Sequence, residues 1–452
     1  MDQLCPPKSV DPMTVLPREL AEQILEYLSF RQRMNACLVS KPWTQFIRSI
    51  PNLWRHLDLS GAKRKVRTTF ISRAINTGRT KIQAATLSNL YDFDKTLVAL
   101  VKHCPLEELT LMECGLQSAN LTKDLLSNQS LKSLRMLRGA EFTAGELYYL
   151  MTALAARLEI FECSVRGYIP PKACTIQCEK LTSLTLDLCE NFSTDLLVDL
   201  AKRMPALQSL SVHQAPGGGG LLRGLTVDLR GCAQLRHVDL GLPIMYTHML
   251  RLPPSLTVLR VHSSRGVGLP TSMLPRLEEL HVGVREAKLP NIGALLSLNA
   301  NSDHTYPDPL PPYPSSAPVA PETTGAASKL RRLTVTNPCH GCTPSQVEQL
   351  LAHERLNELE ELSFSGLLGI FDETAAIIAS AGLKKLRGLD LSSTSVTGVG
   401  VKKLVSTYSL ERLVLNECRT ISTDAVEWAR ARGVQVKYRV TDPSTGGKKV
   451  RY

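Results

Sequence analysis

The sequence predicts an α/β chain in which a small all-helical segment precedes a solenoid of strand-and-helix repeats with a concave parallel sheet. Three observations predict this class. The phrase Leu-x-x-Leu-x-Leu recurs along the chain, the residues before position 54 lack it, and aromatic residues make up only 5% of the composition. An apolar interior built mainly from leucine is typical of folds that stack one short unit many times.

The first segment, residues 13–53, carries apolar residues at helical spacing. Leu16, Leu20, Ile24 and Leu28 recur every four residues, which predicts a helix with Pro17 near its first turn. A second apolar group predicts a short helix that ends near Ser40, and Pro42 then opens a third helix with Trp43. Three short helices enclose little interior, so we expect the next element or a partner to complete their burial.

Residues 54–440 are predicted to form about fourteen repeats. The first apolar positions of these repeats are residues 54, 82, 106, 131, 158, 181, 207, 235, 256, 277, 330, 359, 386 and 410. Alternating leucines place one side of a short strand in the core, and a return segment, helical at 194–204 and 423–432, closes the other side. One unit cannot bury itself, so neighbouring units stack into a parallel sheet, the leucine-rich-repeat horseshoe.

One spacing, between positions 277 and 330, is 53 residues, whereas the others are 21 to 29. The 28 residues 301–328 contain seven prolines, and without them the spacing is 25. We therefore predict a flexible insertion within one repeat. The glycine run 217–220 predicts a smaller loop, residues 434–438 a closing strand, and residues 441–452 a disordered tail.

Several repeats continue into a cysteine that is followed by Ser or Thr, as at Cys114, Cys189 and Cys418. This pattern resembles the cysteine-containing leucine-rich repeats. The resemblance implies that these thiols turn inward at the ends of the strands and have a structural role.

The helical segment resembles the F-box. The matching pieces are Leu16-Pro17-x-Glu19-Leu20, Ile24-Leu25, Tyr27-Leu28, Leu38-Val39-Ser40-Lys41-x-Trp43 and Pro51-Asn52-Leu53-Trp54. The order of these pieces, directly ahead of leucine-rich repeats, is similar to that of fungal F-box proteins. The turn at Ser29–Arg33 departs from the pattern, since many F-boxes carry an acidic residue and a leucine there, and this bears on adaptor affinity.

The resemblance implies a substrate receptor of an SCF ubiquitin ligase, which is not itself an enzyme. The F-box would dock on a Skp-type adaptor and through it on a cullin, while the repeats bind a protein target for ubiquitination and degradation. The residues expected on the adaptor side are Leu16, Pro17, Leu20, Ile24, Leu28, Leu38, Val39 and Trp43. The alternative for each of them is packing inside the F-box.

Polar residues between the leucines predict a target-binding patch on the concave face. Strands of a parallel sheet lie about 4.8 Å apart, so Asp239, Arg260 and His281 should form one lateral row, with His213 and His262 close by. Arginine and histidine there suit an acidic or phosphorylated segment. The alternative is an ordinary polar sheet face.

Composition and charge set the remaining expectations. The net charge of +11 leaves open a second function, a non-catalytic scaffold associated with chromatin or nucleic acid, which salt dependence would reveal. Twelve scattered cysteines, no signal peptide and no long apolar run favour the nucleus or cytoplasm and no membrane. Cys339 and Cys342 have zinc-like spacing, but Cys174 and Cys178 lie too far along the chain to join them. No catalytic motif occurs, and we expect neither a metal nor a cofactor.

Overall fold

The computed structural model describes residues 11, 15–61, 82–88, 93–113, 125, 128–137, 141–166, 176–188, 203–214, 227–241, 250–262, 274–283, 329–336, 342–367, 369–441 and 449–451. These residues belong to two compact units, Met1–Cys189 and Glu190–Tyr452. Each unit is described by itself.

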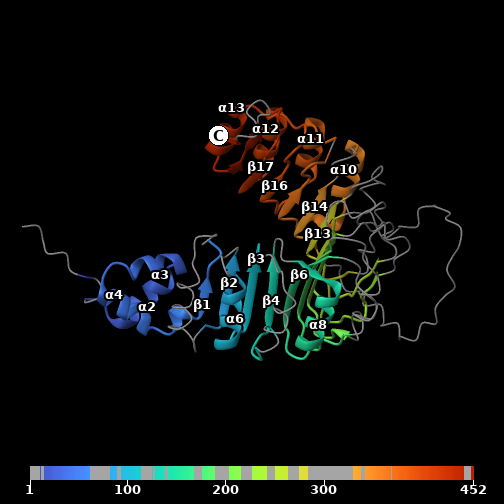
Figure 1. The fold of residues 1–452 in the computed structure, drawn as a ribbon. Helices are drawn as coiled ribbons and strands as arrows, with labels where there is room; N and C mark the ends of the chain where they lie inside the picture. The colour runs from blue at the N-terminus through green and yellow to red at the C-terminus, as the bar shows by residue number, and fades with distance from the viewer. Residues whose placement is uncertain are drawn as a thin grey trace, which may run out of the picture. The chain divides into compact units, whose positions relative to one another are not determined.

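The first unit begins with the three predicted helices, α2 (Arg18–Glu26), α3 (Phe30–Ala36) and α4 (Lys41–Ser49), which Figure 1 shows grouped beside the first strand. Serines start two of them. Ser29 and Gln32 form a reciprocal capping box at α3, and the Ser40 side chain accepts a hydrogen bond from the Trp43 N–H at α4. Pro17 stands at the N-cap of α2, as its position in the sequence predicts.

The interior of the helical segment is closed by Trp54, which follows a single 3₁₀ turn, η1 (Asn52–Trp54). Its ring packs edge-on against Phe30 with centroids 6.4 Å apart, and its indole N–H donates to the Ile47 carbonyl at 3.1 Å. Trp54 is also the first apolar position of the first repeat. The array therefore completes the burial of the helices, as expected from their small size.

Six parallel strands in the order β1-β2-β3-β4-β6-β7 form the sheet of the first unit. They are β1 (His56–Asp58), β2 (Ala84–Ser88), β3 (Glu108–Met112), β4 (Ser133–Leu137), β6 (Ile160–Arg166) and β7 (Ser183–Leu188). The short strand β5 (Glu141–Thr143) also pairs with β6. Two helices are described between the strands, α6 (Phe93–His103) and α8 (Ala144–Leu154).

The second unit continues the pattern with parallel strands in the order β8-β10-β12-β13-β14-β15-β16-β17-β18. They are β8 (Ser209–Gln214), β10 (His237–Gly241), β12 (Val258–Val261), β13 (Glu279–Gly283), β14 (Arg332–Thr336), β15 (Glu361–Ser363), β16 (Gly388–Asp390), β17 (Arg412–Val414) and β18 (Gln435–Lys437). Strand β18 is the predicted closing strand.

The return segments at the end of the second unit are helical. They are α10 (Pro344–Leu351), α11 (Asp372–Ser380), α12 (Gly398–Thr407) and α13 (Thr423–Ala431), with a 3₁₀ turn, η8 (Glu354–Leu356), after α10. Successive helices pack side by side (Figure 1). The predicted helix 423–432 is thus confirmed as α13, whereas most of the predicted helix 194–204 and the glycine run 217–220 lie outside the described residues.

One carboxylate ties two successive helices together. Asp372, in the first turn of α11, accepts hydrogen bonds from the Thr397 and Gly400 backbone N–H groups at 2.8 and 3.1 Å and from the Thr397 hydroxyl at 2.5 Å. The first N–H groups of a helix have no partner within it. Asp372 therefore caps the neighbouring helix, α12.

All fourteen predicted first positions of the repeats are buried, with exposed fractions of 6% or less. A strand begins two residues after each of them. Alternate residues along each strand face the core, as Val238 and Leu240 do in β10, while His237 and Asp239 face the other side, which we call the polar face. The repeat period thus predicted both the strands and the side chains that fill the core.

The long spacing between positions 277 and 330 adds no strand. Strand β13 pairs directly with β14, with Glu279 opposite Arg332. The Arg331 and Arg332 N–H groups both donate to the Glu278 carbonyl at 2.8 and 3.0 Å, the same connection that joins other neighbouring repeats. The chain between them, including the predicted insertion 301–328, lies outside the described residues.

Short strands appear that the sequence analysis did not anticipate. Strand β9 (Val227–Asp228) pairs with β11 (Leu250–Arg251), and β19 (Arg439–Thr441) pairs antiparallel with β20 (Lys449–Arg451), which falls within the segment 441–452 expected to be a disordered tail. None of the helices within the described ranges is long and apolar enough to cross a membrane.

Candidate functional site

An exposed apolar face on the helical segment is the first candidate site. Among the described residues, ten large hydrophobic residues are exposed, and six of them belong to this segment. They are Val15, Leu20, Ile24, Tyr27, Leu38 and Val39. Such a concentration on about forty residues is unusual for a surface that meets only water, because exposed apolar patches commonly mark sites of protein interaction.

Helix geometry explains how α2 can be apolar on two sides. Ala21 and Leu25, one turn apart, are each 1% exposed and fill the interior. Leu20, Ile24 and Tyr27 lie about a quarter turn or more away from them and face outward, with exposed fractions of 48%, 51% and 91%. The outward stripe therefore leaves about half or more of each of these side chains open to a partner.

Leu38 and Val39 protrude from the turn that follows α3, with exposed fractions of 83% and 65%. Their backbone N–H groups donate to the Asn35 and Ala36 carbonyls, so the turn that presents them is hydrogen-bonded. The apolar face is thus built from α2 and from this turn.

None of the eight residues expected on the adaptor side is buried. Pro17, Leu20, Ile24, Leu38 and Val39 are exposed, and Leu16, Leu28 and Trp43 are half-buried. The Trp43 indole N–H donates to an Asp11 carboxylate oxygen at 2.9 Å. Packing inside the F-box was the alternative for each of them, and it applies at most in part to the three half-buried residues.

The second candidate site is the predicted row on the polar face of the second unit. The register places Asp239 opposite Arg260 and Arg260 opposite His281, so the lateral row forms as the sequence predicts. His213 lies on β8 and His262 directly follows β12. The structure therefore brings all five predicted residues together.

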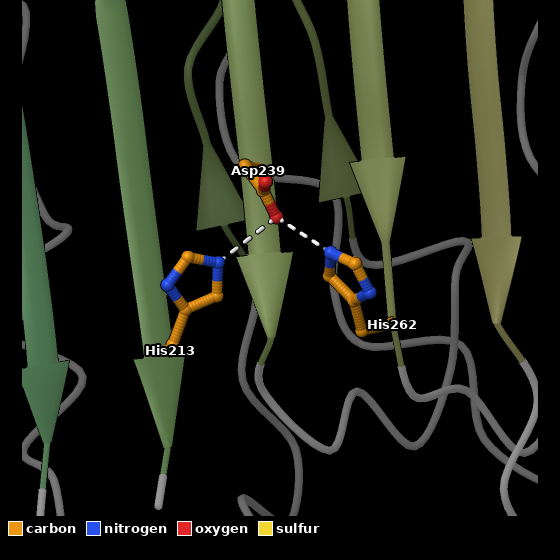
Figure 2. A group of neighbouring side chains, drawn as sticks. All are labelled: His213, Asp239 and His262. Carbon is orange, nitrogen blue, oxygen red and sulfur yellow. Dashed lines mark hydrogen bonds and ion pairs between the residues drawn. The ribbon is translucent and has the colours of Figure 1, made fainter. Parts of the chain in front are cut away.

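The His213 and His262 side chains converge on one carboxylate oxygen of Asp239. The His213 and His262 Nε2 atoms lie 3.1 and 2.8 Å from Oδ1 of Asp239, as Figure 2 shows. Because a carboxylate only accepts, each imidazole donates from Nε2. Burial acts to raise the pKa of Asp239, but the two hydrogen bonds outweigh it and hold this pKa well below its usual value.

The positive charge of the row is already compensated. The Arg260 guanidinium lies 2.6 Å from Glu279 and 3.9 Å from the second oxygen of Asp239, and Arg332 lies 3.5 Å from Glu279. An acidic or phosphorylated segment would have to compete with these carboxylates for the guanidinium groups.

His281 extends the cluster by one strand. Its ring lies 4.7 Å from that of His262, centroid to centroid. Burial, and then the charge of His262, lower the pKa of His281 to about 4. His281 is therefore neutral at physiological pH, and it adds no positive charge to the row.

Two glycines that the sequence analysis passed over make room for the histidines. Gly241 lies opposite His213 in the register, and a Cβ atom at Gly241 would stand 2.5 Å from the His213 ring. A Cβ atom at Gly283 would stand 2.8 Å from the His262 carbonyl oxygen. The space above Gly241 lets the His213 ring approach Asp239, and glycine at the end of a strand was the available signal.

The described cysteines are buried thiols. Cys418 is fully buried, and its Sγ donates to the Leu391 carbonyl at 3.0 Å, consistent with an inward structural position. Burial raises the pKa of Cys342 to about 11, which keeps this thiol protonated and unreactive. Cys114, Cys174, Cys189 and Cys339 lie outside the described residues.

Comparisons with known proteins bear on the helical segment and on the whole chain. Residues 13–60 match the F-box-like family. The chain is similar to the F-box/TPR repeat protein pof3 of Schizosaccharomyces pombe, with 23% identity over 98% of this chain and 77% of that protein.

Two solved structures are also similar. The crystal structure of the Rad7 and Elc1 complex in yeast matches with 14% identity and a TM-score of 0.48, over 95% of this chain and 98% of that one. An internalin from Listeria monocytogenes matches with 15% identity and a TM-score of 0.42, over 88% of this chain and 93% of that one. Taken with the family match at residues 13–60, the exposed apolar helices constitute an F-box-like domain, and a long parallel sheet of solenoid-like repeats follows it.

Proposed function

We propose that this chain is the substrate-recognition subunit of an SCF-type E3 ubiquitin ligase. In this proposal the F-box-like domain docks on a Skp-type adaptor, which connects it to a cullin, and the repeats bind the protein target that is ubiquitinated and degraded. The observation that supports the proposal most strongly is the apolar face of Leu20, Ile24, Leu38 and Val39.

This face suits docking because the backbone that carries its side chains is held in place before any partner arrives. Leu20 and Ile24 stand on a helix whose other side is fixed by Leu25, and Leu38 and Val39 stand on a hydrogen-bonded turn. A preordered apolar surface loses little conformational entropy on binding, so most of the free energy from burying it contributes to affinity.

The chain's part in ubiquitin transfer would be proximity. A target held by the repeats would have its lysines kept at a high effective concentration near a ubiquitin thioester carried by another subunit. The repeats offer an extended polar face for this contact, and the row from His213 to His281 is the proposed place on it. No bond chemistry by this chain is required.

The test is binding of a purified Skp-type adaptor to the full chain and to the variant Leu38→Asp/Val39→Asp. Val399→Asp is the matched control, since Val399 is 71% exposed on α12 and lies outside the F-box-like domain. We expect the adaptor, and a cullin added with it, to be retained by the wild type and the control and lost from the double variant.

Moderate salt should leave this retention unchanged, because the contact is apolar. Failure of the folded wild-type chain to bind the adaptor would refute the proposal. Capture of nucleic acid that weakens steeply with salt would instead favour the chromatin- or nucleic-acid-associated scaffold.

A further inference from the structure

The His213–Asp239–His262 cluster can do more than contact a protein. His213 lies on β8, Asp239 lies on the neighbouring β10, and His262 directly follows β12, where its N–H donates to the Leu240 carbonyl at 2.9 Å (Figure 2). The sheet therefore places two imidazoles on either side of one carboxylate.

The atoms that converge are the ones that bind transition metals. The two Nε2 atoms and one carboxylate oxygen all lie within 4.8 Å of one another. Ligands bound tetrahedrally to zinc at about 2.0–2.2 Å lie roughly 3.3–3.6 Å apart. The Nε2–Oδ1 distances of 3.1 and 2.8 Å need to open by less than about 1 Å, and the two Nε2 atoms, within 4.8 Å of each other, need to come closer; rotation of the side chains can supply both changes.

We propose that His213, Asp239 and His262 bind one zinc ion on the polar face of the sheet. Two imidazole nitrogens and one carboxylate oxygen favour zinc over magnesium or calcium, which prefer oxygen ligands alone. The ion takes the place of the two Nε2–H protons, and each imidazole stays neutral by carrying its one proton on Nδ1 instead.

The charges around this point balance one another. The second oxygen of Asp239 faces Arg260 at 3.9 Å, which leaves Oδ1 as the ligand atom, and Glu279 at 2.6 Å offsets the charge of Arg260. A carboxylate held by a neighbouring group in this way is typical of metal ligands. Gly241 leaves room for the His213 ring.

The site is open on one side. The Asp239 side chain is 12% exposed, whereas those of His213 and His262 are 35% and 36% exposed. Three protein ligands at the surface leave a coordination position to water or to an imidazole, thiolate or carboxylate of a bound protein. The zinc site thus adds a metal-mediated contact to the polar face, and it does not depend on adaptor docking.

The test is zinc binding to the full chain after removal of metal with a chelator, measured by equilibrium dialysis with metal analysis. The test variant is His213→Asn/His262→Asn, and His237→Asn is the matched control because His237 lies on β10 and faces the same side as Asp239. Removing a residue that hydrogen-bonds to a metal ligand weakens metal binding about 10- to 100-fold. Removing two of the ligands themselves should therefore weaken zinc binding at least 100-fold.

The expected result is one zinc ion more in the wild type and the control than in the double variant. With ten histidines and twelve cysteines in the chain, this difference is the informative quantity, since other thiols and imidazoles contribute equally to all three proteins. Cobalt should give the visible absorption bands of this four-coordinate site in the wild type and the control, and these bands should be missing from the double variant. If the double variant fails to fold, Asp239→Asn, which keeps the shape of the side chain, takes its place. Equal zinc content and affinity in wild type and folded variant would overturn the proposal.

Discussion

Truncating the outward stripe of α2 should weaken adaptor binding while the F-box-like domain stays folded. Burying a leucine or isoleucine side chain completely contributes about 1.5–3 kcal/mol. Leu20 and Ile24 are 48% and 51% exposed, so burying the exposed part of each side chain against the adaptor contributes about 1 kcal/mol. The variant Leu20→Ala/Ile24→Ala should therefore lose about 2 kcal/mol, a roughly 30-fold rise in the dissociation constant.

The assay is titration calorimetry of the full chain with a purified Skp-type adaptor, together with thermal unfolding of each variant. The control Val399→Ala removes a more exposed side chain from α12 and should leave the affinity unchanged. Leu25→Ala, at a residue that is 1% exposed, should instead destabilise the F-box-like domain by about 2–5 kcal/mol. An unchanged affinity in Leu20→Ala/Ile24→Ala would refute the assignment of this stripe to the adaptor.

Three further predictions concern the repeats. Asp372→Ala should destabilise the array by about 2–4 kcal/mol in urea unfolding, because three donors at the start of α12 lose their acceptor, whereas Glu373→Ala should have little effect. Gly241→Ala should displace the His213 ring and lower zinc affinity at least tenfold while adaptor binding persists. The pKa of His281 is lowered to about 4 in the folded chain. Between pH 6.5 and 4, His281 is therefore protonated in the unfolded chain but not in the folded chain. Stability should accordingly fall as the pH drops through this window, and His281→Asn should reduce the slope.

The strand repeat was predictable because its period fixes both pairing and burial. Once positions 235, 256 and 277 are assigned as equivalent, parallel pairing in register places Asp239, Arg260 and His281 in one row, and the structure has this row. A one-residue error in the period would have moved these side chains into the core.

Three features could not be predicted by the same reasoning. In α2, both Leu20 with Ile24 and Ala21 with Leu25 have helical spacing, so periodicity alone does not tell which pair faces the interior. His213 lies opposite Gly241 in the register, so its ring reaches Asp239 diagonally, two residues back along the neighbouring strand. This approach depends on the absence of a side chain at Gly241. Strand pairs such as β9 and β11 are two residues long and leave no pattern.

The position of Trp54 bears on how an assembled complex could move. This residue closes the helical interior through Phe30 and Ile47 and also begins the first repeat, so no length of free chain separates α4 from β1. A subunit clamped to α2 would consequently turn together with β1 as one rigid body. The connection between α4 and β1 therefore supplies no swivelling between a subunit bound to α2 and the first repeat.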